Sequence, residues 1–180
     1  RVVVIDEAYV DFGGESAVGL TKKYDNILVC QTFSKSRSFA GGRLGYGIGS
    51  EALISDLNTV KYSTNPYNIN SMTSAMGIGI IKDGEYTATN CRTIMENRDY
   101  TVKALETMGF RVLPSSANFI FVSSDKIDGG EYYRKLKEKK ILVRHFDKPR
   151  ISSWCRVSIG RRDQMEAFLK ATEEILKEKV

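Results

Sequence analysis

Two short apolar runs, each ending at a polar side chain, constrain the fold of this chain more than any other feature. Residues 2–5 form a β-branched run that ends at Asp6, and residues 26–31 form a second run that ends just before a loop containing Lys35. Continuous apolar runs of this length are typical of strands buried on both faces of a parallel sheet. We therefore expect residues 2–5 to be a central strand, and the chain to be the C-terminal part of a longer polypeptide.

The pattern of the remaining sequence predicts two parts. Before about residue 85 the chain has the pattern of a parallel α/β layer, and after Gly109 it has that of a smaller α+β unit, joined by a long helix. The expected helices cover residues 51–60, 69–81, 86–108, 131–140 and a last amphipathic segment with Met165, Phe168, Leu169, Thr172, Ile175 and Leu176. Further strands are expected at residues 44–49, within 110–124, at 141–146 and at 155–160. Ser50 and Gly109 fit helix caps.

Composition excludes several classes of protein. Hydrophobic residues make up 42% and charged residues 27%, which is ordinary for a soluble globular domain. No apolar run approaches the roughly 20 residues that span a bilayer, so we expect a cytoplasmic protein that binds no membrane. The net charge of +5 is spread among acidic residues, which favours small anionic ligands over nucleic acid. Three scattered cysteines suggest neither a disulfide framework nor a metal site.

The loop after the second apolar run has the residues of a reactive anion-binding site. Lys35 lies among small residues, where desolvation favours a nucleophilic amine that can form a Schiff base. Ser34, Ser36 and Arg43 supply the hydroxyl and guanidinium donors that a phosphate needs. Taken singly, Asp6 also fits a helix cap or surface ion pair, and Lys35 a solvated loop lysine.

Asp6 and Lys35 together indicate a more specific chemistry. Ligands of parallel sheets bind beyond the carboxyl ends of the strands, where both residues are expected. A carboxylate there can hold a pyridine nitrogen protonated, while the lysine and the phosphate donors hold two other parts of the same molecule. This set of groups fits pyridoxal 5'-phosphate.

Five segments, in order, carry a resemblance to a known family. They read DEAYVDF, TFSKSRSFAGGRLGY, NPYNINSMTSAMG, ANFIFV and CRVSIG. They resemble fold-type-I pyridoxal-phosphate aminotransferases, and within them the histidinol-phosphate branch, over nearly the whole chain. The resemblance implies an α/β fold: part of a large cofactor-binding domain with a mostly parallel sheet over residues 1–85, then the connecting helix and a small α+β C-terminal domain over residues 86–180.

The resemblance also implies roles for the cofactor-binding residues. Lys35 would form the Schiff base and move the proton, Asp6 would pair with the pyridine nitrogen, and Tyr9 would bond the ring hydroxyl. Ser34 and Arg43 would hold the cofactor phosphate. Relatives add an N-terminal half and a second subunit, so we expect a homodimer.

Two late arginines are the candidates for substrate binding. By resemblance, Arg156 would bind a substrate carboxylate and Arg144 the phosphate of histidinol phosphate, with Asn118 near the active site and glutamate and 2-oxoglutarate as the second substrate pair. From the residues themselves, Arg144 shares an apolar strand face with Leu142 and must meet an anion or reach water. Both arginines also fit a solvent-exposed edge.

Two other functions stay open. A threonine-phosphate decarboxylase of the same fold also recognises an amino-phosphate substrate. A non-catalytic module of a transcription regulator can keep the same lysine.

Overall fold

The computed structural model describes residues 1–178 and divides into two compact units. Unit 1 covers Arg1–Cys91 and unit 2 begins at Arg92. The division lies inside the helix α3, Gly84–Thr107. Among the described residues, no helix has both the length and the apolar character needed to cross a membrane.

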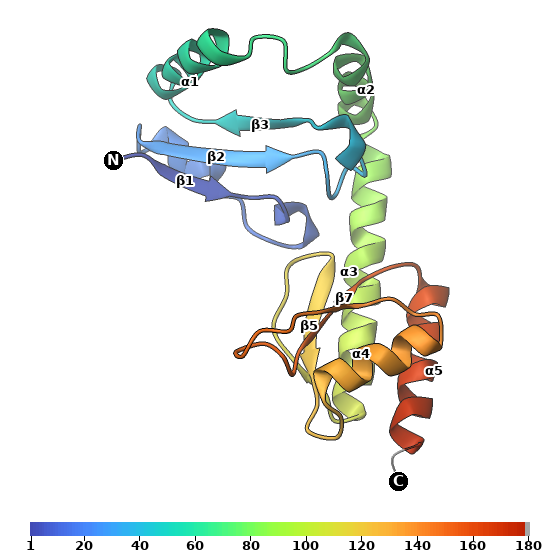
Figure 1. The fold of residues 1–180 in the computed structure, drawn as a ribbon. Helices are drawn as coiled ribbons and strands as arrows, with labels where there is room; N and C mark the ends of the chain where they lie inside the picture. Colours follow the sequence, from blue (N-terminus) through green and yellow to red (C-terminus); the bar gives the residue numbers. More distant parts are fainter. Residues whose placement is uncertain (179–180) are drawn as a thin grey trace. The chain divides into compact units, whose positions relative to one another are not determined.

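Unit 1 is built on a three-stranded sheet in the order β1-β2-β3 (Figure 1). Its strands are β1 (Val3–Asp6), β2 (Ile27–Thr32) and β3 (Gly45–Ile48). β1 and β2 are parallel, with Asp6 opposite Cys30, whereas β2 and β3 are antiparallel. The expectation of a mostly parallel sheet therefore holds for only one of the two pairings. Residues 33–44 bring the chain straight back beside β2, and they contain only the short 3-10 turn η3 (Ala40–Gly42) rather than a crossover helix.

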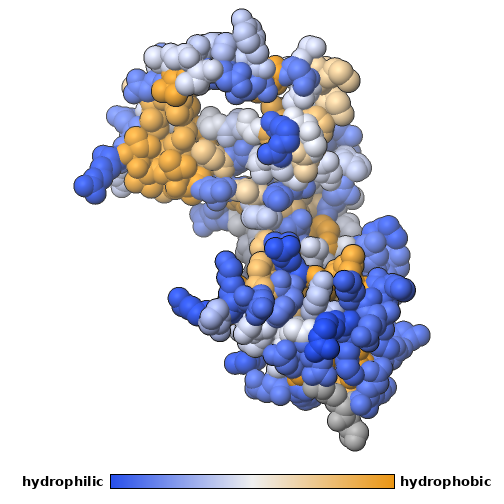
Figure 2. Space-filling view, in the orientation of Figure 1, coloured by the Kyte–Doolittle hydropathy of each residue, from blue (hydrophilic) through white to orange (hydrophobic). Residues whose placement is uncertain are grey.

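Residues 2–5 are not a central strand in the part of the chain that the structure describes. There β1 pairs with β2 only, and Val2, Val3 and Val4 are 55%, 48% and 60% exposed. Figure 2 shows the resulting hydrophobic surface at the β1 edge. The apolar run predicted the strand correctly, and within residues 1–178 this strand lies at the edge of the sheet.

Two helices follow the sheet of unit 1, and side-chain caps fix where each begins. The Ser50 hydroxyl accepts a hydrogen bond from the Leu53 amide at the start of α1 (Glu51–Thr64). The Asn70 side chain accepts one from the Thr73 amide at the start of α2 (Ser71–Lys82). Both caps satisfy amides that have no partner within the helix. The predicted helices and the Ser50 cap are confirmed.

Unit 2 contains an antiparallel sheet in the order β4-β5-β7-β6. The strands are β4 (Arg111–Val112), β5 (Phe119–Ser123), β6 (Arg144–His145) and β7 (Cys155–Ser158). The helices are α4 (Gly129–Glu138) and α5 (Arg162–Lys177). Only two residues of the expected strand 141–146 pair in the sheet.

One face of this sheet packs on the helices to form the core of unit 2. Ile120 and Val122 of β5 and Cys155 and Val157 of β7 are buried there. From α5 the core receives Met165, Phe168, Leu169, Ala171, Thr172 and Ile175, with Leu176 partly buried. The amphipathic spacing therefore predicted this helix correctly.

Gly109 ends α3 as predicted. Its φ of 89° is in the left-handed region, which glycine adopts without steric cost. Its amide donates to the Glu106 carbonyl, and the Phe110 amide donates to the Leu105 carbonyl. This glycine-terminated turn passes the chain from α3 into β4.

Candidate active site

The lysine loop, residues 33–44, connects β2 to β3 and places Lys35 beyond the carboxyl end of β2. Asp6 is the last residue of β1, and because β1 and β2 are parallel the two residues lie beyond the same edge of the sheet. The Lys35 side chain is exposed, and its Nζ lies 5.4 Å from the centre of the Tyr9 ring. The structure thus brings Lys35 and Tyr9 together at the edge where parallel sheets bind ligands.

The two candidate phosphate ligands lie at opposite ends of the loop. The Ser34 hydroxyl accepts a hydrogen bond from Thr32 at 3.1 Å, so its own proton is available to an anion. Arg43 is exposed and has a φ of 52°, and its Nη1 donates to the Ala40 carbonyl. An exposed guanidinium, a free amine and a hydroxyl on one loop form a donor set that fits a phosphate.

Glu7 is a charged residue of this region that the sequence reading missed. Its carboxylate is buried, at 8% exposure, and accepts hydrogen bonds from the Ala17 amide, the Gln31 side chain and the Ser16 hydroxyl. Burial raises the pKa of the Glu7 carboxyl, but these bonds outweigh it and hold the pKa below its ordinary value of 4.5. Strand alternation was the available signal, because neighbouring residues at the end of β1 point to opposite faces.

Asp11 and Arg37 were also missed as a pair. Arg37 Nη1 donates to Asp11 Oδ2 at 3.1 Å, and the Ser36 hydroxyl donates to the same oxygen. No spacing rule links residues this far apart in sequence, so the contact emerges only from the fold.

In unit 2, Arg156 lies in an apolar hollow of about 380 Å³. The residues that line the hollow with it are Leu113, Pro114, Ser115, Phe119, Phe121, Phe146 and Ile151. Its guanidinium carbon lies 5.2 Å from the centre of the Phe119 ring. Its Nε is buried and has no hydrogen-bond partner among residues 1–178. A buried, unpartnered guanidinium nitrogen is costly, so this arrangement fits the binding of an anion.

Arg144 is the direct cross-strand neighbour of Arg156. The two residues are paired in the antiparallel register of β6 and β7, so they share one face of the sheet. Like charges in this position repel each other unless an anion lies between them. Arg144 is exposed and Leu142 is 76% exposed, so Arg144 reaches water, which is one of the two alternatives expected for it.

Asn118 and His145 lie in the same unit with different surroundings. Asn118 directly precedes β5, and its carbonyl accepts a hydrogen bond from the Ile159 amide. The His145 ring contacts the Ser152 carbonyl at 2.6 Å and stacks on Tyr133. Through these contacts the His145 ring packs within unit 2.

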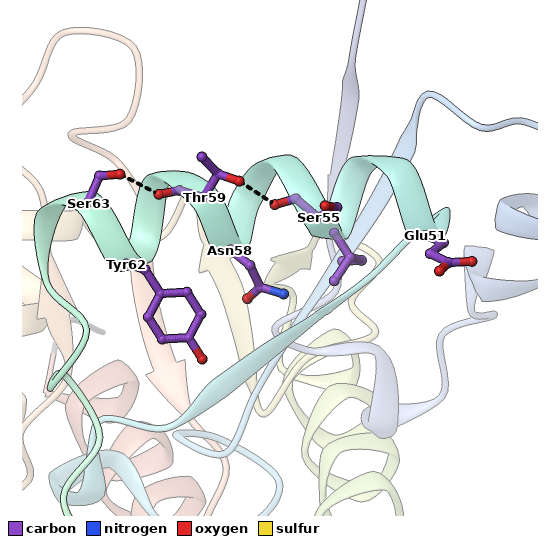
Figure 3. A pocket seen from close by; sticks show the side chains of 7 residues that line it. Glu51, Ser55, Asn58, Thr59, Tyr62 and Ser63 are labelled. Atoms are coloured by element: carbon purple, nitrogen blue, oxygen red, sulfur yellow. Dashed lines mark hydrogen bonds between the residues drawn. The ribbon is translucent and has the colours of Figure 1, made fainter.

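Another hollow of unit 1 contains none of these residues. It measures about 620 Å³, and all the residues that line it come from α1 (Figure 3). Thr59 and Ser63 donate to backbone carbonyls of their own helix there. A single helix face with internally bonded hydroxyls offers no converging groups, so we do not take it as the site.

Fold and site together define an α/β protein with a lysine and anion-binding donors at the carboxyl ends of its strands. The sequence profile of the family described as "Aminotransferase class I and II" matches residues 1–171. The chain therefore belongs to the class I and II aminotransferase family.

Individual relatives agree with this assignment. A histidinol-phosphate aminotransferase of Clostridium botulinum (strain Okra / Type B1) is 46% identical over 176 residues, 98% of this chain and 50% of the relative. The crystal structure of the enzyme of that name from Clostridium acetobutylicum has a TM-score of 0.88 and 28% identity, over 99% of this chain and 55% of its own. The crystal structure of histidinol-phosphate aminotransferase from Sinorhizobium meliloti in complex with pyridoxal-5'-phosphate has a TM-score of 0.82 and 21% identity. The match covers 100% of this chain and 50% of that one, and at this identity it shows the fold alone. The chain thus spans about half the length of the curated relatives it matches.

Proposed function

We propose that the protein containing this chain is a pyridoxal-phosphate-dependent aminotransferase that moves an amino group between histidinol phosphate and 2-oxoglutarate. The observation that carries the proposal is the exposed Lys35 amine, placed over the Tyr9 ring at the carboxyl ends of β1 and β2. The similarity to histidinol-phosphate aminotransferases supports the choice of substrate.

The candidate site residues of unit 1 are assigned to the cofactor. Pyridoxal phosphate, when bound, supplies an electron sink for the carbon that loses its proton. Lys35 would hold the cofactor covalently and, once its amine is free again, would move the proton as general base and acid. Asp6 would keep the pyridine nitrogen protonated, Tyr9 would bond the ring hydroxyl, and Ser34 and Arg43 would bind the phosphate.

The residues of unit 2 recognise the substrates. Arg156, with its unpartnered Nε, binds the carboxylate of glutamate or 2-oxoglutarate. Arg144, directly opposite in the sheet, binds the phosphate of histidinol phosphate, which has no carboxylate. Asn118, next to β5, lies near the bound substrate.

One assay tests the proposal against its enzymatic rival. The complete protein, loaded with pyridoxal phosphate, is given histidinol phosphate with 2-oxoglutarate, or threonine phosphate alone. We expect glutamate to form in the first mixture and no carbon dioxide in the second. Carbon dioxide release without glutamate formation would assign the decarboxylase, and inactivity in both mixtures would favour a non-catalytic role.

A further inference from the structure

The side chains that follow Lys35 are held by one carboxylate from another segment. Asp11 Oδ2 accepts a hydrogen bond from the Ser36 hydroxyl at 2.5 Å and from Arg37 Nη1 at 3.1 Å. Ser36 is buried, at 6% exposure, and the side chains of Arg37 and Asp11 are 19% and 32% exposed. This is a partly buried ion pair with a second hydrogen bond, so it orders its partners more than a solvated surface pair does.

Arg37 is held on its remaining sides by aromatic rings. Its guanidinium carbon lies 5.2 Å from the centre of the Phe33 ring and 5.9 Å from that of Tyr46. Its Nη2 also donates to the Tyr46 hydroxyl at 3.4 Å. Phe33 directly follows β2 and Tyr46 belongs to β3, so Arg37 joins both ends of the loop to Asp11.

The contacts continue from Tyr46 back to the segment that contains Asp11. The Tyr46 hydroxyl donates to Gln31, and the Gln31 side chain donates to buried Glu7. In the sequence, Glu7 and Asp11 flank Tyr9, whose ring faces the Lys35 amine. The segment after β1 therefore binds the lysine loop directly through Asp11, and Glu7 is linked to Arg37 of the loop only indirectly, through Gln31 and Tyr46.

Lys35 itself takes no part in this set of contacts. Its side chain is exposed, and the turn that follows it includes Ser38 with a φ of 53°, which a non-glycine residue adopts at a cost. The Ser38 amide donates to the Lys35 carbonyl. A strained turn of this kind needs support from its surroundings, and the anchored neighbours, Ser36 and Arg37, supply it.

We propose that Asp11 is a positioning residue, which holds the backbone of Lys35 in place by binding Ser36 and Arg37. Asp11 touches neither cofactor nor substrate in this account. It fixes the backbone from which the exposed Lys35 side chain extends, which favours the reaction of the amine with a carbonyl compound. The proposal rests on the proposed function, in which Lys35 is the residue that reacts.

The test measures loop order and reactivity separately. In the complete protein without cofactor, hydrogen–deuterium exchange is followed in peptides covering residues 33–43, for the wild type and for Asp11→Ala and Asp11→Asn. Loss of a hydrogen-bonded charge corresponds to roughly tenfold or more in an opening equilibrium, so we expect about tenfold faster exchange in this loop for Asp11→Ala. Asp11→Asn keeps an acceptor for Ser36 and should show a smaller increase. Glu15→Ala removes an exposed acid from the next loop and should leave exchange unchanged.

The second readout is the rate at which added pyridoxal phosphate becomes covalently attached, followed by absorbance. We expect Asp11→Ala to slow attachment about tenfold and Ser36→Ala to slow it in the same direction. The proposal would be overturned if Asp11→Ala showed the wild-type rates of loop exchange and of cofactor attachment. It would also be overturned if exchange became faster throughout unit 1 in Asp11→Ala, Asp11→Asn and Ser36→Ala, because that result would show a general structural role. If the wild type attaches the cofactor at another lysine, the proposed function fails, while the exchange data still report on Asp11.

Discussion

At the scale of single residues, the most informative groups are charges in unusual places. Arg156 has a buried nitrogen without a partner in residues 1–178, and Arg144 is its direct neighbour across the sheet. Two adjacent cations, one of them in an apolar hollow, are unfavourable in the absence of an anion. Their arrangement fits the anion-binding roles proposed for the two arginines.

Replacing each arginine separately should reveal a division of labour. A charge-assisted hydrogen bond contributes roughly 1.5–3 kcal/mol, which is about one to two orders of magnitude in kcat/KM. Arg144→Ala should therefore lower kcat/KM for histidinol phosphate by that amount, and Arg156→Ala should affect glutamate more than Arg144→Ala does. Arg134→Ala, an exposed arginine on α4, is the control. Equal losses for both substrates in both variants would contradict the assigned roles.

Glu7 should make stability depend on pH. Its pKa is lowered in the folded protein, so its contribution is present above the unfolded value near 4.5 and is lost as the pH falls through the folded value. Glu7→Gln should lower the Tm of the complete protein at pH 7, by the equivalent of about 1–3 kcal/mol, and the gap to wild type should shrink toward pH 4. Glu15→Gln, on the surface, should show no such gap. A gap that stays constant between pH 7 and pH 4 would show that the carboxylate charge is not what matters.

At the scale of elements, local sequence patterns predicted the helices and strands, whereas the contacts between segments could not be predicted from the sequence. The apolar runs, the amphipathic spacing of α5 and the cap residues Ser50 and Gly109 predicted elements that the structure confirms. The antiparallel β3, the exposure of β1 and the anchoring of Arg37 were not predictable, because each depends on which segments meet in space. The same limit applies to the site: Lys35 and Asp6 follow strand ends, whereas the part played by Asp11 needs the fold.

The lysine loop offers a matched pair of glycines for a test. A Cβ on Gly42 would lie 2.1 Å from the Phe39 ring, whereas one on Gly41 would meet nothing within 4 Å. Gly42→Ala should displace the ring and the turn before Arg43, at a cost of about 1–3 kcal/mol, and weaken pyridoxal-phosphate binding. Gly41→Ala should leave the Tm and the affinity near the wild-type values. Similar behaviour of the two variants in thermal unfolding and cofactor titration would argue against this packing.

At the scale of the whole molecule, the chain spans half the length of its curated relatives and exposes the valines of β1. The proposed activity belongs to the complete protein, because this chain covers only 50% of the relative from Clostridium botulinum. We therefore predict that residues 1–180 alone transfer no amino groups under conditions where the complete protein is active. Circular dichroism should show that this isolated chain is folded. Comparable turnover by the isolated chain would show that its own residues are sufficient.

The most direct test of the account is to trap the cofactor on its lysine. The complete protein is loaded with pyridoxal phosphate, reduced with borohydride, digested and mapped by mass spectrometry, alongside Lys35→Arg. The account predicts that the label lies on Lys35 in the wild type and is absent from that peptide in the variant. A label on a different lysine in the wild-type protein would contradict it.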